Sequence, residues 1–254
     1  MALGYNWNWG ILFQPEPGGS GTWLNYLLVG LEWSIVTALS AWVIALVVGS
    51  VVGTLRTTTN VWVVRLGNAY VEIFRNIPLI VQMFLWFFVF PEFLPKGLGD
   101  AIKQMPPPWG AFVPAVLCLG IFTSVRVAEQ TRAGIQSLPR GQRMAGTAMG
   151  LTQAQTYIHV ILPQAFRIIL PPLTSEFMNI IKNSSIALTI GLLELTGRAR
   201  AMQEMTFQVF EAFAAATLIY LLTNLIVVLG MRWVERRVRV PGLIAASGPA
   251  QAGH

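Results

Sequence analysis

Long apolar runs separated by short polar segments are the dominant pattern along this chain. The first three runs cover residues 25–55, 66–90 and 111–135. About 20 consecutive apolar residues form a helix that crosses the roughly 30 Å of hydrocarbon in a bilayer. The charge-free part of the second run is shorter than that, so its helix must begin before Arg75. We therefore predict three transmembrane helices in this part of the chain.

Two further runs complete the pattern, and they differ in kind. The run at residues 210–231 carries no charge from Ala212 onward, whereas residues 168–193 are broken by Pro171-Pro172, by Glu176 and by Lys182-Asn183-Ser184-Ser185. Charged groups and irregular backbone are tolerated at membrane depth only where they are buried in protein or line a cavity. The predicted fold class is therefore all-α, with five transmembrane helices, the fourth of which lines a polar cavity.

Two connecting segments have distinct compositions. Residues 91–110 are dense in Pro and Gly, which break helices, and we expect a loop outside the hydrocarbon. Residues 137–159 contain too much Gln, Thr and Arg for a lipid environment. We expect two short interfacial helices there, joined at Gly150, because glycine permits a turn with positive φ or a close approach of the backbone. Pro163 then opens the next span, since proline fits the first turn of a helix.

Composition narrows the class of protein. The chain is 54% hydrophobic and 11% charged, whereas a soluble domain carries about 25% charge. This excludes a water-soluble enzyme. The net charge of +6 would suggest a nucleic-acid partner in a soluble protein, but here Lys and Arg lie between apolar runs, where they set orientation. We therefore expect membrane lipid around the chain and no nucleic-acid partner. Cys118 is the single cysteine, which excludes an intrachain disulfide framework.

The positive charges are distributed unequally between the two sides of the predicted bundle. One side carries most of the 17 basic residues, namely Arg56, Arg65, Arg75, Arg132, Arg140, Arg143, Arg167, Arg232, Arg236, Arg237 and Arg239. The other side carries Lys96, Lys103, Arg198 and Arg200. Because cytoplasmic loops hold the excess of Lys and Arg, the C-terminus is predicted in the cytoplasm and the N-terminus outside. The expected organisation is an outer segment 1–24, a membrane domain 25–236 and a cytoplasmic tail 237–254.

Sequence patterns for catalysis are missing from this chain. It has no Gly-x-x-x-x-Gly-Lys-Ser/Thr phosphate loop, no cluster of metal ligands and no nucleophile motif. We therefore predict no catalytic residue, no metal and no cofactor on the chain. Gly49 and Gly53 form a Gly-x-x-x-Gly pattern, which allows two helices to approach closely and predicts packing.

The polar segment resembles a known family, the membrane permease subunits of bacterial ABC importers. Their cytoplasmic loop reads Glu-Ala-Ala, three residues, Gly, nine residues, then Ile-x-Leu-Pro. Here the register is kept from Ala145 through Gly150 to Leu162-Pro163. The chain departs from the pattern at Met144, where the family has Glu, and at Gly146, where it has the second Ala. The resemblance implies a coupling loop at about residues 138–163.

Further stretches resemble the polar amino acid branch of that family. Residues 72–82 are similar to its Glu-x-x-Arg-x-x-Pro-Leu-x-x-Gln pattern, and residues 128–142 to its Ala-Glu-x-x-Arg-x-Gly-Ile-x-Ser-x-Pro-x-Gly-Gln pattern. The resemblance covers residues 23–236, and within the branch it is strongest to permease subunits for glutamate and aspartate. It implies the MetI-like fold of type I importer permeases, in a bacterial inner membrane, with the N-terminus periplasmic.

The resemblance also implies partners and a function. The expected partners are two ATP-binding subunits, which would carry ATP and Mg, a homologous but non-identical second permease subunit, and a periplasmic amino acid-binding protein. The expected function is to form half of the translocation pathway of an ATP-driven importer for glutamate and aspartate. The resemblance assigns coupling to the ATPases to the loop residues Ala145, Gly146, Gly150, Leu162 and Pro163.

An acidic amino acid requires a fixed cation in the pathway. Arg126 is the candidate, because a guanidinium binds a carboxylate through two hydrogen bonds and this one lies past the middle of the third span. Its alternative role is a structural ion pair with Glu129, three residues further along the helix, and the two roles are compatible.

Other polar groups are candidates to orient the substrate. Asn183, Ser184 and Ser185 offer amide and hydroxyl groups for the α-amino and α-carboxylate ends of an amino acid. Their alternative role is hydrogen bonding between helices, which Ser and Asn commonly provide in membranes. Gln82 is a further candidate along the pathway.

Two other functions are kept as alternatives. One is a permease for another polar amino acid, such as glutamine. The other is an ion-coupled secondary carrier that uses Arg126, Glu129 and Lys182 as an intramembrane charge relay. Such carriers are often built from internal repeats, and none is detectable in this chain, which argues against the carrier.

Overall fold

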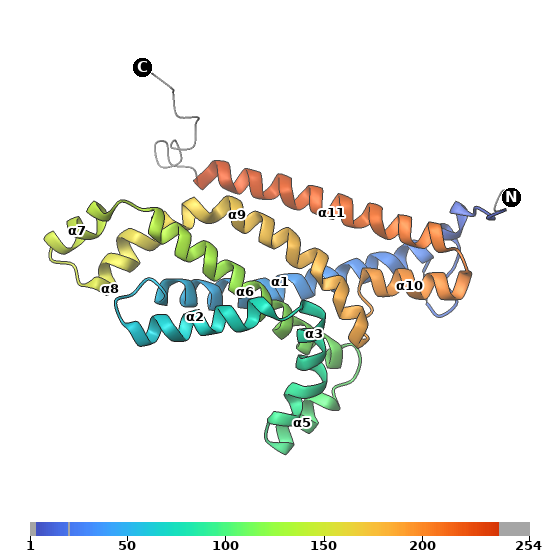
Figure 1. Cartoon of the computed structure of the whole chain (residues 1–254). Coiled ribbons are helices and arrows are strands. Elements are labelled where there is room, and N and C mark those ends of the chain that lie inside the picture. The colour runs from blue at the N-terminus through green and yellow to red at the C-terminus, as the bar shows by residue number, and fades with distance from the viewer. Residues whose placement is uncertain (1–3, 20, 239–254) are drawn as a thin grey trace.

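The computed structural model describes residues 4–19 and 21–238, and apart from one isolated bridge between Pro15 and Thr22 all its regular elements are helical. The predicted tail 237–254 lies outside the described residues from position 239 onward. Four long helices run side by side along the molecule (Figure 1), namely α1 (Trp23–Leu55), α6 (Trp109–Ser137), α9 (Leu162–Asn183) and α11 (Val209–Val238). The predicted all-α class is confirmed.

Shorter elements occupy the two ends and one flank of this bundle (Figure 1). The short helices α7 (Arg140–Ala148) and α8 (Gln153–Thr156) form one end, and the other end carries η1 (Trp9–Phe13) and α10 (Leu195–Thr206). The flank consists of α2 (Val61–Asn76), α3 (Leu79–Phe84), the π-helix η2 (Leu85–Val89), α4 (Phe90–Phe93) and α5 (Lys96–Lys103). Two further segments interrupt regular helix, the π-helix η3 (Tyr157–Ile161) and the 3₁₀-helix η4 (Ser184–Ile190).

Small residues on α1 allow it to pack closely along α6. A Cβ atom at Gly49 would lie 2.6 Å from the carbonyl oxygen of Ser124, and one at Gly53 would lie 2.6 Å from that of Ala128. Neither contact is sterically possible, so both positions require glycine at this helix separation. The packing role predicted for the Gly-x-x-x-Gly pattern is confirmed, and it acts within one subunit.

The second predicted span is bent, because α2 and the segment Leu79–Phe93 meet at an angle of 102°. The bend lies at Ile77-Pro78, where Ile77 is extended (φ −98°, ψ 125°) and Pro78 precedes α3. A residue before proline avoids the helical region because it clashes with the proline ring. The prediction of one helix over residues 66–90 was therefore wrong. The loop expected at 91–110 was also wrong in part, since it contains α5 and the start of α6.

The fourth predicted span breaks at only one of its expected positions. Helix α9 continues through Pro171-Pro172 and ends at Asn183, where the backbone tightens into η4. Proline removes one backbone donor, which membrane helices tolerate when neighbouring groups satisfy the freed carbonyl. The predicted interruption at the two prolines was wrong, and the break at residues 183–185 is confirmed. Helix α10, which follows Gly191, was not predicted.

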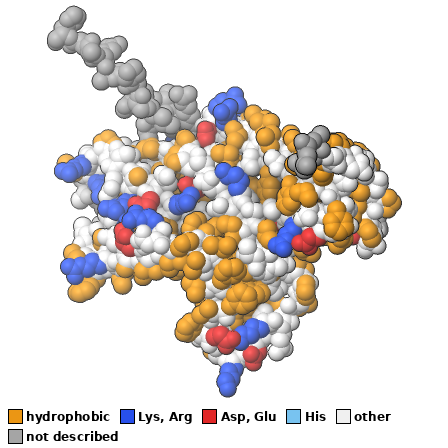
Figure 2. Space-filling model, turned by 45° about the vertical axis from the view of Figure 1, so that its right-hand side comes forward, with side chains coloured by type: hydrophobic (Ala, Val, Ile, Leu, Met, Phe, Trp, Pro, Cys, Tyr) orange, Lys and Arg blue, Asp and Glu red, His pale blue; other side chains and the backbone are white. Residues whose placement is uncertain are grey.

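Three helices in the described ranges are long and apolar enough to cross a membrane, namely α1, α6 and α11. The bent pair of α2 and Leu79–Phe93 gives a fourth. Helix α9 has sufficient length but carries Arg167, Glu176 and Lys182, so the count of five remains a prediction. Figure 2 shows hydrophobic side chains over much of the visible surface and several Lys and Arg side chains at the end that carries α7.

Candidate functional site

An ion pair joins the two central helices of the bundle. Arg126 on α6 donates from Nη1 to Oε2 of Glu176 on α9, at 3.4 Å. The Arg126 side chain is 46% exposed and that of Glu176 is 13% exposed. The guanidinium also lies over the ring of Phe122, 5.3 Å from its centroid. Opposite charges therefore lie together at an accessible position between two helices, with the cation the more available of the two.

Glu129 has a different partner from the one predicted. Its Oε1 forms an ion pair with Nη2 of Arg56 at 3.1 Å, and Nε of Arg56 donates to Oδ1 of Asn68 at 2.8 Å. Arg56 is buried between α1, α2 and α6, where its charge needs a carboxylate. The predicted pairing of Arg126 with Glu129 is therefore wrong. Glu176, which sequence reasoning treated only as an interruption of the fourth span, takes that place.

The polar sequence at the end of α9 lies on the same helix as Glu176. Asn183 follows Glu176 by seven residues, or two helical turns, so both project from one face of α9. Asn183 is half-buried. The hydroxyls of Ser184 and Ser185 donate to the carbonyls of Ile181 and Lys182, each at 2.7 Å. These contacts are local to the helix end, in contrast to the interhelical bonds that were the alternative.

Gln82 stabilises the bend between α2 and α3. Its side-chain nitrogen donates to the carbonyl of Phe74 at 2.8 Å and to that of Ile77 at 3.0 Å. Both carbonyls lie at the end of α2, where no further turn of helix satisfies them. The side chain of Gln82 is almost fully buried. Its observed contacts are thus to the protein backbone at the bend.

Replacing Gln82 with leucine is expected to destabilise the protein, because two partly buried carbonyls at the end of α2 would lose a donor. An unsatisfied buried group costs about 1–3 kcal/mol of unfolding free energy. A lower midpoint of thermal unfolding for the purified complex carrying Gln82→Leu would show this. Gln104→Leu, at an exposed position after α5, is the matched control. Equal midpoints for the two variants would contradict the stabilising role.

The turn between α7 and α8 has a defined geometry that requires glycine. Gly150 has φ +81°, its N–H donates to the carbonyl of Thr147 at 3.0 Å, and the N–H of Leu151 donates to that of Gly146 at 3.1 Å. This pair of bonds is the Schellman motif, in which glycine takes the left-handed conformation after a helix. Thr152 then caps α8 through a reciprocal pair of bonds with Gln155. Of the two roles predicted for Gly150, the structure shows the turn with positive φ, and no atom lies within 4 Å of an added Cβ.

The two short helices pack against each other and, together with η3, form a unit that we call the elbow (residues 140–161). Gly146 is buried against α8, where an added Cβ would lie 2.8 Å from the side chain of Thr156. The π-helix η3 comes directly after α8 in the chain. Pro163 has no N–H to donate to the carbonyl of residue 159, so the regular α-helical hydrogen bonding is interrupted there. Leu162 packs with the buried cluster that joins the elbow to the end of α6, formed by Ile135, Leu138, Tyr157, Ile161 and Ala165.

The elbow is also attached to the end of α1. The hydroxyl of Tyr157 donates to the carbonyl of Thr57 at 3.0 Å, and Arg143 lies over the Tyr157 ring, 5.3 Å from its centroid. No sequence pattern indicated this bond, because the two residues lie 100 positions apart in the chain. A displacement of the elbow would therefore act on α1 as well as on α6.

Large apolar side chains are exposed on the elbow among polar ones such as Gln153 and Gln155. Met144 is 64% exposed, Met149 80% and Ile158 59%. Ala145 is also exposed. Exposed flexible apolar side chains of this kind are typical of a surface that binds a partner protein.

These features define a class of protein. The bundle contains long apolar helices, holds an accessible ion pair between two of them, and carries at one end an elbow with exposed apolar side chains. This is the organisation of a membrane permease subunit that works with a partner. The chain belongs to the family of inner membrane components of binding-protein-dependent transport systems, whose model matches residues 45–240. It is therefore a permease subunit of an ABC importer, which excludes the alternative of an ion-coupled secondary carrier.

Curated relatives carry the similarity over nearly the whole chain. The glutamate/aspartate import permease protein GltJ of Escherichia coli (strain K12) is 48% identical over 94% of this chain and 98% of its own length. The probable glutamine ABC transporter permease protein GlnM of Bacillus subtilis (strain 168) is 34% identical over 82% of this chain and 91% of its own length.

Solved structures have the same fold. A chain from the crystal structure of an amino acid ABC transporter with histidines superposes with a TM-score of 0.70 at 30% identity, and covers 85% of this chain and 95% of that one. A chain of the inward-facing MetNI methionine ABC transporter gives a TM-score of 0.68 at 21% identity, over 89% of this chain and 100% of that one. The predicted MetI-like fold is confirmed.

Proposed function

We propose that this permease subunit carries acidic amino acids, glutamate and aspartate, across the inner membrane. The observation that carries the proposal is the accessible Arg126–Glu176 pair between α6 and α9. The similarity to the glutamate/aspartate import permease over 94% of the chain supports the substrate class. The chain forms half of a translocation pathway, and a homologous second permease subunit forms the other half.

The pair provides complementary charges for an amino acid. The guanidinium of Arg126 binds a substrate carboxylate through two hydrogen bonds, and the carboxylate of Glu176 binds the α-ammonium group. In the structure the two side chains pair with each other, at a separation of 3.4 Å. Asn183, two turns from Glu176, supplies an amide that orients the far end of the substrate.

Partners complete the importer. A periplasmic binding protein delivers the amino acid to the outer face, and two ATP-binding subunits, which hold ATP and Mg, dock on the cytoplasmic elbow. The N-terminus is then periplasmic and the C-terminus cytoplasmic. The exposed Met144, Met149 and Ile158 provide apolar contacts to the ATPase, where related loops have a glutamate in place of Met144. ATP-driven movement of the ATPases displaces the elbow as a rigid unit and opens the bundle alternately to each side.

The experiment that tests this function is uptake of radiolabelled glutamate, aspartate and glutamine into proteoliposomes that contain the full complex and its binding protein. We expect ATP-dependent uptake of glutamate and aspartate, with glutamine at least about tenfold slower, which corresponds to a difference near 1.4 kcal/mol. Preferential uptake of glutamine would contradict the proposed substrate and favour the alternative of a permease for another polar amino acid. Uptake that persists without ATP would contradict the proposed coupling.

A further inference from the structure

A cavity of about 510 Å³ lies at the end of α6 that is opposite the elbow. It is enclosed by η2, α4 and α5 on one side and by the start of α6 and the end of η4 on the other. Pockets that bind small molecules have volumes of about 300–1,000 Å³, so this one has the size of a ligand site. In the proposed orientation the cavity lies on the outer side of the membrane, away from the Arg126–Glu176 pair.

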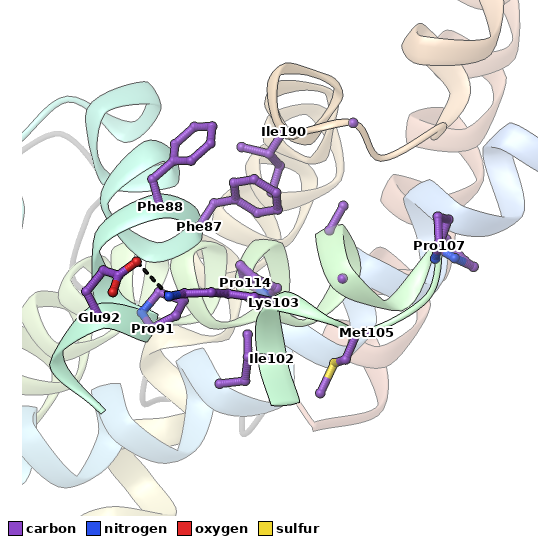
Figure 3. A pocket seen from close by; sticks show the side chains of 14 residues that line it. Phe87, Phe88, Pro91, Glu92, Ile102, Lys103, Met105, Pro107, Pro114 and Ile190 are labelled. Atoms are coloured by element: carbon purple, nitrogen blue, oxygen red, sulfur yellow. Dashed lines mark ion pairs between the residues drawn. The ribbon is translucent and has the colours of Figure 1, made fainter. Parts of the chain in front are cut away.

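The lining of the cavity combines apolar walls with one pair of opposite charges (Figure 3). Phe87, Phe88 and Pro91 supply apolar surface, and Nζ of Lys103 lies 2.6 Å from Oε1 of Glu92. The two charged side chains point toward each other across one side of the cavity (Figure 3). They are 40% and 65% exposed, so water screens their attraction and the pair opens at little cost.

The far wall of the cavity belongs to the same segment as the polar residues of the inner site. Ile190 and Gly191 line the cavity, and they end the 3₁₀-helix η4 that begins at Ser184, directly after Asn183. Gly191 has φ +89°, so the chain reverses there and turns towards α10. A ligand in the cavity would therefore contact one end of η4, while the other end adjoins the inner site.

We propose that this cavity is an outer binding site for the free amino acid, occupied before the substrate reaches Arg126. The ligand carboxylate binds the ammonium group of Lys103, its α-ammonium binds the carboxylate of Glu92, and its methylene groups lie against Phe87 and Pro91. One exposed ion pair is replaced by two, which match the α-ammonium group and one of the two carboxylates of an acidic amino acid. The inference rests on the proposed function for the identity of the ligand, which is L-glutamate.

The test measures protection of a cysteine placed in the cavity wall. The full complex in lipid discs carries Ile102→Cys, a position that lines the cavity, and a maleimide reagent alkylates it. The native Cys118 is buried and gives little background. We expect millimolar L-glutamate to slow the alkylation, by about twofold when half of the sites are occupied. Gly97→Cys, on the exposed face of α5 with no other atom near, should react at the same rate with and without glutamate.

Second substitutions separate this site from the inner one. Protection of Ile102→Cys should persist with Arg126→Ala, disappear with Lys103→Met and persist with Lys96→Met, which removes the same charge from the same helix. Equal alkylation rates with and without glutamate would overturn the inference. Protection that is lost with Arg126→Ala, or that remains with Lys103→Met, would overturn it as well. Uptake by the unsubstituted complex is a separate measurement: its failure would refute the proposed function, whereas the protection result concerns the cavity alone.

Discussion

The Arg126→Ala variant is expected to lose most of its ATP-driven uptake of glutamate and aspartate. A hydrogen bond to a charged group contributes about 1.5–3 kcal/mol, and each 1.4 kcal/mol is a factor of ten in affinity. Loss of the guanidinium should therefore weaken the inner site by roughly 10- to 100-fold. Initial rates at substrate concentrations below saturation, in proteoliposomes with the binding protein, measure this effect. Arg167→Ala, at an exposed position near the start of α9, is the control and should transport normally.

A double variant distinguishes substrate binding from a structural ion pair. Removing Arg126 alone also leaves Glu176 without its partner, and that side chain is only 13% exposed. Arg126→Gln combined with Glu176→Gln removes both charges and leaves no unpaired carboxylate. If the pair only stabilises the contact between α6 and α9, the double variant should recover uptake. We expect no recovery, because neither charge for the amino acid remains. Recovered uptake would assign the pair to packing.

Sequence patterns predicted the long helices well and the bent ones poorly. Helices α1 and α11 follow from long apolar runs, since crossing a bilayer requires about 20 apolar residues and the sequence shows them directly. The bend at Ile77-Pro78 and the continuity of α9 through Pro171-Pro172 depend on which neighbours satisfy the backbone groups. Proline occurs at both positions, so the residue type alone does not distinguish a bend from a continuous helix.

The ion pairs of the site also depend on helix packing, which sequence patterns do not show. Spacing along one helix suggested that Arg126 pairs with Glu129, because residues three apart are neighbours. In the structure Glu129 pairs with Arg56 of α1 and Arg126 pairs with Glu176 of α9. Both partners are brought in by helix packing over long sequence distances. The positive φ at Gly150 was predictable, in contrast, because a glycine between two short helices sets a local backbone geometry.

Replacing Gly150 with valine is expected to uncouple ATP hydrolysis from transport. Gly150 has φ +81°, a conformation in which a β-branched residue is a strained outlier. Such strain costs about 1–3 kcal/mol, and the turn relieves it only by abandoning the bonds from Gly150 to Thr147 and from Leu151 to Gly146. The elbow would then no longer hold α7 and α8 in one orientation. We expect uptake to fall by roughly tenfold, the factor that 1.4 kcal/mol produces, while ATP hydrolysis by the complex continues.

Two further substitutions show whether the backbone conformation is the cause. Gly150→Asn should retain most of the uptake, because asparagine enters the left-handed region more readily than other residues with a side chain. Gly141→Val, in the first turn of α7 where no atom lies near an added Cβ, should also transport normally. Parallel assays of uptake and phosphate release measure the ratio of amino acid transported to ATP hydrolysed. An unchanged ratio in Gly150→Val would mean that the elbow transmits movement without a fixed turn, which the rigid coupling proposed above does not allow.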